Sequence, residues 1–134
     1  MMMLECDAKA FLASVGVNVP AGTVWRRGEA AAGVNVAAYP VAVKAQVRSG
    51  GRGKQGGVVK VADRAALEAA AKKLFDTEFG GEKPDALLIE PWLAIDREAY
   101  LSVAVDGRAE GYVVMYSPKG GMDIEDGRPP CAPG

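Results

Sequence analysis

The spacing of apolar residues in the first third of the chain changes from helical to strand-like and back. One apolar stripe predicts a helix over residues 4–15, and Gly16 and Pro20 are placed to end it. Strand-forming residues follow at 22–25. An alanine-rich stretch then predicts a short helix over residues 28–38.

The middle of the chain holds two β-branched runs on either side of a glycine-rich segment. Residues 41–47 and 58–61 therefore predict two strands of a hairpin with a long tip. Asp63 is a good N-cap for a helix over residues 64–75. The residues of that helix expected to face inward are Leu67, Ala71, Leu74 and Phe75.

Three further strands are expected over residues 86–91, 99–105 and 112–117, with a tight turn at Asp106-Gly107. The resulting order is helix, strand, helix, hairpin, helix and a mostly antiparallel set of strands. This order predicts an α+β fold. Residues 126–134 have no core-forming pattern and are expected to form a flexible tail.

Composition limits the possible chemistry more than it limits the fold. The 134 residues are 49% apolar and 25% charged, which suits one small domain with a packed core. The longest apolar stretches are near ten residues, too short for a transmembrane helix. The sequence contains no histidine, which excludes a Ser-His or Cys-His catalytic pair, a His-ligated zinc ion and a phosphohistidine on this chain.

The two cysteines, Cys6 and Cys131, are too few for a disulfide framework or a four-ligand metal site. We expect them to be free thiols in a reducing compartment. The N-terminus becomes acidic too early for a secretory signal, so a cytoplasmic location is expected.

Charge is unevenly distributed along the chain. Residues 1–60 hold eight basic and three acidic side chains, whereas residues 61–134 hold eight basic and fourteen acidic ones. A local positive field in a chain of net charge −1 favours a discrete anion site over general nucleic-acid binding.

The glycine-rich segment, residues 49–57, is the most informative part of the sequence. Five glycines in nine residues let backbone N–H groups approach an anion closely. Arg52 and Lys54 add positive charge, and Lys44 lies on the strand that leads into the segment. This combination suits a triphosphate, although it matches neither a Walker loop nor a dinucleotide-binding loop. A solvated hairpin tip and an RNA-binding arm remain alternatives.

A second pattern lies in residues 87–98. An apolar run leads to Glu90 at a strand end, and Glu98 follows eight residues later. Such a connector can wrap a purine, with the backbone of residues 91–93 reading the adenine edge and a glutamate accepting a ribose hydroxyl. In isolation the same residues could form an exposed turn.

Residues 44–58 closely resemble the nucleotide loop of succinyl-CoA synthetase (succinate–CoA ligase) β subunits. Further similar segments, in chain order, are residues 4–9, 17–22, 89–101 and 120–125. The resemblance implies an ATP-grasp fold, in which two α+β subdomains hold a nucleotide between them. It places residues 20–98 in the smaller, nucleotide-binding subdomain, and residues 1–19 and 99–125 in the larger one.

The resemblance also implies roles for individual residues. Lys44 would contact the phosphates, and Gly51, Arg52 and Gly53 would lie along the nucleotide. The remaining implied contacts are Glu90 and the backbone of Leu93 at the adenine, and Glu98 at the ribose. Arg48 stands where many relatives carry a histidine in this loop.

In this family the β subunit pairs with an α subunit that carries a phosphohistidine. The pair interconverts succinate, CoA and ATP or GTP with succinyl-CoA, the nucleoside diphosphate and phosphate. Because family members are much longer, we expect this chain to be the N-terminal part, without the asparagine and aspartate that hold Mg²⁺. We therefore expect no catalytic residue and no metal ligand on this chain, and no turnover by it alone. The alternatives are a stand-alone nucleotide-binding regulatory module and a nucleic-acid-binding basic hairpin.

Overall fold

The computed structural model describes residues 2–120, which belong to two compact units, Met1–Leu93 and Ala94–Gly134. Residues 121–134 lie outside the described residues, and they include all but the first residue of the 120–125 segment, the expected tail and Cys131. No helix within residues 2–120 is long and apolar enough to cross a membrane.

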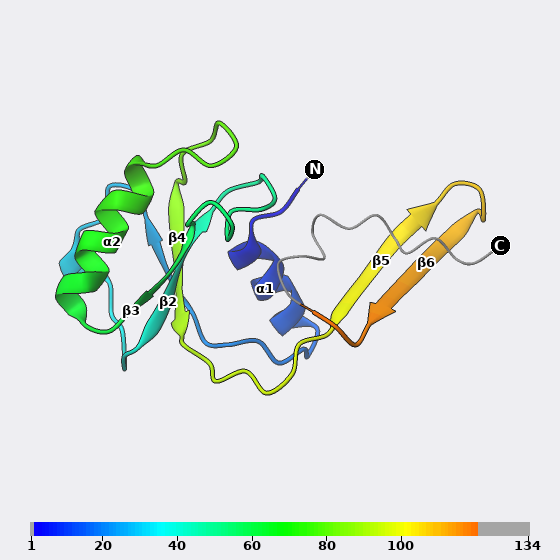
Figure 1. Ribbon diagram of the computed structural model, residues 1–134, viewed down its shortest axis with the longest axis horizontal. Helices are drawn as coiled ribbons and strands as arrows, with labels where there is room; N and C mark the ends of the chain where they lie inside the picture. The colour runs from blue at the N-terminus through cyan, green and yellow to red at the C-terminus, as the bar shows by residue number, and fades with distance from the viewer. Residues whose placement is uncertain (1, 121–134) are drawn as a thin grey trace. The chain divides into compact units, whose positions relative to one another are not determined.

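The first unit is built on a four-stranded antiparallel sheet with strand order β1-β4-β2-β3 (Figure 1). The central strands β2 and β4 pair in a register that places Ala42 opposite Glu90 and Lys44 opposite Leu88. All four strands lie where the sequence predicts them. Their bounds are β1 Thr23–Arg26, β2 Val41–Gln46, β3 Val58–Val61 and β4 Ala86–Pro91.

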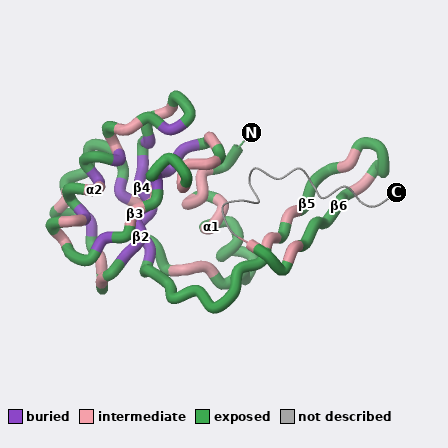
Figure 2. Tube along the Cα trace, viewed as in Figure 1, coloured by how far each residue is buried: buried purple, intermediate pink, exposed green. Residues whose placement is uncertain are grey.

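Helix α2, Arg64–Asp76, covers one face of this sheet and closes the hydrophobic core (Figures 1 and 2). Asp63 caps it as predicted, because its carboxylate accepts a hydrogen bond from the amide of Ala66 at 2.8 Å. Three of the residues expected to face inward are buried, and Phe75 is partly buried against Trp25, with ring centroids 6.2 Å apart. The buried three are Leu67, Ala71 and Leu74.

The helix predicted over residues 28–38 is wrong, since only a single 3₁₀ turn, η1 Ala31–Gly33, forms there. Val34 ends that turn in an extended conformation and is buried in the core. The Arg64 guanidinium donates to the carbonyl oxygens of Ala31 and Val34, so α2 satisfies the carbonyl groups that a longer helix would use. Tertiary contacts therefore override the alanine-rich helix signal.

Helix α1, Glu5–Ser14, confirms the helix predicted at the N-terminus and lies on the sheet face that α2 leaves uncovered (Figure 1). Its attachment is polar, because the amide of Cys6 donates to the side-chain oxygen of the buried Gln46 at 2.9 Å. No residue of α1 is buried, and on its apolar stripe Phe11 is 60% exposed. The apolar stripe therefore predicted the helix correctly, but it did not indicate which face of the helix contacts the sheet.

The second unit contains a two-stranded hairpin, β5 Tyr100–Asp106 and β6 Gly111–Ser117, as predicted. Asp106 begins its turn by accepting a hydrogen bond from the amide of Arg108 at 2.8 Å. One face of the hairpin carries three cross-strand pairs of large, exposed hydrophobic residues. These pairs are Leu101 with Tyr116, Val103 with Val114 and Val105 with Tyr112.

Candidate nucleotide-binding site

Lys44 and Glu90 lie together on the sheet face opposite α2. Residues directly opposite each other in an antiparallel pair project to the same face, as do alternate residues of one strand. The pairing of Ala42 with Glu90 and of Lys44 with Leu88 thus puts both charged side chains on one face. Lys44 Nζ is 2.7 Å from Glu90 Oε2. The structure therefore brings together the residue predicted to hold phosphates and the one predicted to border the base.

Helix α1 adds two charged residues to this pair. Glu5 Oε1 is 3.0 Å from Lys44 Nζ and 2.8 Å from Lys9 Nζ. Lys9 also donates to Glu90 Oε1, and the guanidinium of Arg52 pairs with Glu5 Oε2. We refer to Glu5, Lys9, Lys44, Arg52 and Glu90 as the ion cluster. It joins one helix, two strands and the glycine-rich loop.

Burial differs sharply within the ion cluster. The Glu90 side chain is only 4% exposed, whereas the other four side chains are 19–23% exposed. Glu90 is thus the buried carboxylate around which the cluster is arranged, and its charge is compensated by two ammonium groups. The cluster has three cations and two carboxylates, a formal charge of +1.

The pKa values of two cluster residues are shifted. Burial alone raises the pKa of Glu90, but hydrogen bonds and positive charge from Lys44 and Lys9 outweigh burial and hold that pKa below its ordinary 4.5. Burial lowers the pKa of Lys9 below 10.5, and the repulsion from Lys44 acts in the same direction. Glu90 is therefore ionised at neutral pH and anchors the lysines as a carboxylate.

Backbone hydrogen bonds within the glycine-rich loop hold much of it in a defined turn. The amide groups of residues 54–57 donate to carbonyl oxygens of residues 51–53 at 2.7–3.3 Å. A β-carbon on Gly57 would lie 2.9 Å from the carbonyl oxygen of Arg52, so this turn requires glycine there. Four amides expected to face an anion are thus used inside the loop. Side chains supply the charge that this part of the site presents.

A neighbouring segment, residues 79–82, braces the start of the loop. The Ser49 hydroxyl donates to the carbonyl oxygen of Phe79 at 3.0 Å. The amide of Arg48 donates to Glu82 Oε2 at 3.0 Å, and its guanidinium lies 3.3 Å from Glu82 Oε1. Arg48 therefore ties the start of the loop to residues 79–82 through the Glu82 carboxylate.

Two other residues predicted to contact the nucleotide, Leu93 and Glu98, are not part of the ion cluster. Leu93 ends the first unit and is 55% exposed. Glu98 belongs to the second unit, where its carbonyl oxygen accepts a hydrogen bond from the amide of Gly120 at 3.1 Å. The assignment of Leu93 to the adenine and of Glu98 to the ribose stays a prediction.

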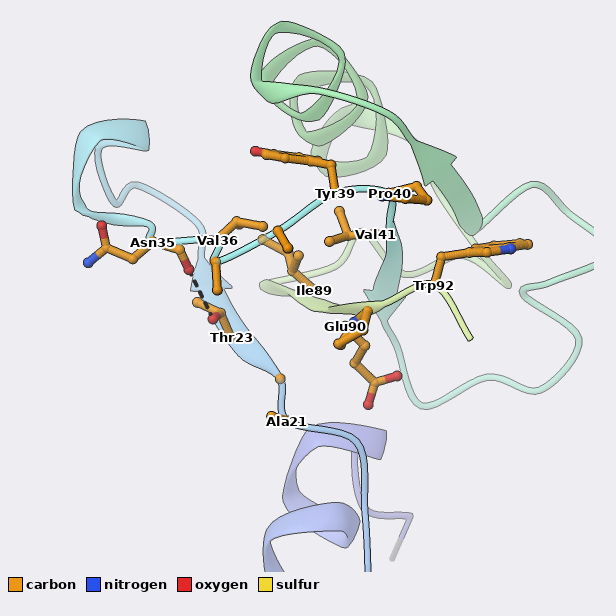
Figure 3. A pocket seen from close by; sticks show the side chains of 14 residues that line it. Ala21, Thr23, Asn35, Val36, Tyr39, Pro40, Val41, Ile89, Glu90 and Trp92 are labelled. Atoms are coloured by element: carbon orange, nitrogen blue, oxygen red, sulfur yellow. Dashed lines mark hydrogen bonds between the residues drawn. The ribbon is translucent and has the colours of Figure 1, made fainter. Parts of the chain in front are cut away.

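A cavity of about 600 Å³ opens beside the end of β4 and is bordered by Glu90, Pro91 and Trp92. Figure 3 shows that the Glu90 carboxylate points away from this cavity, toward α1. Lys60 Nζ lies 4.9 Å from the centre of the Trp92 ring, so the connector after β4 is itself beside a cation. A smaller cavity of about 300 Å³, bordered by Cys6 and Leu88, lies where α1 meets the sheet.

The side chains of residues 2–120 do not fit a divalent metal. Within residues 2–120, no group of three or more His, Cys, Asp or Glu side chains is arranged to hold one. Both carboxylates of the ion cluster are already paired with ammonium or guanidinium groups. Mg²⁺ prefers several oxygen ligands in octahedral geometry, so we assign it no step on these residues.

Glu5 and Lys9 are the cluster members that the sequence does not reveal as site residues. Their spacing of four residues on a helix predicts that they pair with each other, which they do. Their partners Lys44 and Glu90 are 39 and 81 positions away, and nothing local in the sequence predicts those contacts.

The family model described as an ATP-grasp domain matches residues 2–127. The chain belongs to the ATP-grasp domain family. This confirms the predicted fold, and the helices and antiparallel sheets of the structure confirm the α+β class. The ion cluster thus lies on the sheet of an ATP-grasp domain.

Curated relatives of this ATP-grasp chain carry the name "succinate–CoA ligase [ADP-forming] subunit beta". That of Desulforapulum autotrophicum is 42% identical over 134 residues, covering 93% of this chain and 35% of the relative. That of Acidobacterium capsulatum is 40% identical, covering 94% and 35%, and that of Methanocaldococcus jannaschii is 34% identical, covering 94% and 34%. The chain therefore spans about a third of the length of these relatives, and the resemblance found in the sequence is confirmed.

Proposed function

We propose that this ATP-grasp chain is the nucleotide-binding part of an acyl-CoA synthetase β subunit and that it binds ATP or GTP. The observation that carries the proposal is the convergence of Lys44, Arg52 and Lys9 on the sheet face next to the glycine-rich loop. Three cations at one place, partly exposed, suit a triphosphate because each phosphate group brings negative oxygens that accept charge-assisted hydrogen bonds.

Lys44 and Arg52 have different parts in this proposal. Lys44 is on a central strand and is held by the buried Glu90, so its ammonium is in place before the nucleotide arrives. Arg52 is on the loop flanked by Gly51 and Gly53, and its guanidinium can take two phosphate oxygens at once. A rigid ammonium and a loop guanidinium would fix the triphosphate along residues 51–53.

The base and ribose belong at the end of β4 in this proposal. The 600 Å³ cavity beside Glu90 and Trp92 lies within the size range of small-molecule sites and supports placing the purine at this connector. The backbone of Leu93 would border the adenine, and Glu98 would accept a ribose hydroxyl. The assignment of residues 20–98 to the smaller subdomain, with 1–19 and 99–125 in the larger, is part of the same proposal.

The whole-enzyme chemistry is proposed from the relatives. In it, succinate, CoA and a nucleoside triphosphate give succinyl-CoA, the nucleoside diphosphate and phosphate, in the cytoplasm. The phosphoryl group would pass to a histidine of an α subunit, since this chain contains none. This chain would bind and orient the nucleotide without a catalytic residue of its own, so we expect no turnover from it alone.

Calorimetric titration of the purified chain with ATP, GTP and a single-stranded RNA tests the proposal. We expect both nucleotides to bind only weakly, with affinity on the order of millimolar, because the chain forms part of the cleft, and we expect RNA not to bind at low salt. The pairing of Arg52 with Glu5 and of Arg48 with Glu82 reduces the positive charge that the hairpin offers to RNA, which argues against the RNA-binding alternative. RNA binding that falls steeply with salt, without nucleotide binding, would contradict the proposal. Micromolar nucleotide affinity would instead favour the stand-alone module.

A further inference from the structure

Glu5 occupies the place in the ion cluster that an anionic ligand would need. Its Oε1 lies 3.0 Å from Lys44 Nζ and 2.8 Å from Lys9 Nζ, and its Oε2 pairs with Arg52. One carboxylate thus contacts all three cations of the cluster. This is the pattern of contacts that a phosphate group makes with ammonium and guanidinium donors.

We propose that Glu5 is a resident competitor for the phosphate groups: it holds Lys44 and Arg52 in binding positions in the empty site and is displaced when a polyphosphate binds. The inference rests on the proposed function, because it concerns the same site. It adds that nucleotide binding is coupled to release of the first turn of α1, and that affinity is set partly by a carboxylate outside the sheet.

Burial decides which of the two carboxylates can leave. Glu90 is on a central strand with its side chain 4% exposed, so moving it would leave two lysines facing a buried gap. Glu5 is 23% exposed and belongs to a helix with no buried residues. Displacing Glu5 from the cluster therefore exposes no buried residue of α1, and water or a phosphate oxygen can replace its contacts.

Electrostatics gives the direction of the effect. With Glu5 in place the cluster has a formal charge of +1, and neutralising Glu5 raises it to +2. A polyphosphate then meets a stronger positive field and displaces no competing charge. The variant Glu5→Gln keeps the size of the side chain and removes the charge.

The test is calorimetric titration of Glu5→Gln with inorganic tripolyphosphate and with ATP. We expect tripolyphosphate and ATP each to bind the Glu5→Gln variant about tenfold more tightly than they bind the wild type. Asp7→Asn is the matched control, because Asp7 is an exposed carboxylate on the same helix outside the cluster, and it should change affinity less than about twofold. Binding by Glu5→Gln that is unchanged, weaker or merely equal to that of Asp7→Asn would overturn the proposal.

Two further variants keep the outcome decisive. Glu5→Asp retains the charge but withdraws the carboxylate by one methylene from Arg52 and Lys44, and should tighten binding by about two- to threefold even if Glu5→Gln folds poorly. Circular dichroism checks that each variant is folded. If Lys44→Ala binds tripolyphosphate as the wild type does, the proposed nucleotide site itself is wrong. If Lys44→Ala weakens binding while Glu5→Gln does not tighten it, only the role of Glu5 is wrong.

Discussion

Replacing Lys44 by alanine is expected to weaken ATP binding by about 1–3 kcal/mol. The lysine stands on a central strand, is aligned by a buried carboxylate, and keeps its ammonium near the loop that carries Arg52. Its removal deletes a charge-assisted hydrogen bond that the bound phosphates would receive. It also leaves Glu90 with Lys9 alone, which makes the face more negative. Calorimetric titration with ATP measures the loss.

A matched control separates this local effect from a change in overall charge. Lys72 is an exposed lysine on α2, which covers the other face of the sheet. Lys72→Ala removes the same charge and should leave the ATP affinity within about twofold of the wild type. Equal affinities for Lys44→Ala and the wild type would show that the phosphates are bound elsewhere.

Replacing Glu90 by glutamine is expected to lower the free energy of unfolding by about 2 kcal/mol at pH 7. The neutral amide keeps the volume of the side chain but cannot compensate the two ammonium groups that contact it. Urea denaturation followed by circular dichroism measures the difference. Glu68→Gln is the control, because Glu68 pairs with Arg64 on the exposed side of α2 and should contribute less than about 1 kcal/mol.

The Glu90→Gln variant also tests how the folding stability contributed by Glu90 depends on pH. The pKa of Glu90 is lower in the folded chain than its ordinary 4.5, so the unfolded chain binds more protons just below that pH. The stabilisation by Glu90 is therefore fully present above about pH 5 and is lost as the pH falls through the folded-state pKa. The stability difference between the wild type and Glu90→Gln should shrink over this acid range. A difference that stays constant down to pH 3 would contradict the ionised state assigned to Glu90.

Local sequence signals were sufficient for most of the fold. Strand β2 and helix α2 are predicted because the run of β-branched residues, the Asp63 cap and the spacing of Leu67, Ala71 and Leu74 all act within a few residues. Residues 28–38 show the limit of such signals. There the burial of Val34 and the contacts from Arg64 decide the conformation, and both depend on elements distant in the sequence.

In the candidate site, too, some residues are predictable from their neighbours in the sequence and others depend on distant contacts. Lys44, Arg52 and Glu90 stand out in the sequence because a strand lysine, a glycine-rich loop and a strand-end carboxylate each have recognisable neighbours. The part played by Glu5 depends on how α1 docks, through the contact between Cys6 and the buried Gln46. That docking buries no apolar residue of α1, so hydrophobic periodicity carries no information about it.

The central claim is that a nucleotide binds on the α1-facing side of the sheet, with its phosphates at Lys44 and residues 51–53. The most direct measurement is an NMR titration of the isotope-labelled chain with ATP, following backbone amide and lysine side-chain resonances. The account predicts saturable shifts at Lys44, at residues 51–53 and at the first turn of α1, together with smaller shifts at Trp92. Saturable shifts confined to α2 and the opposite face of the sheet, with Lys44 and the loop unmoved, would contradict it.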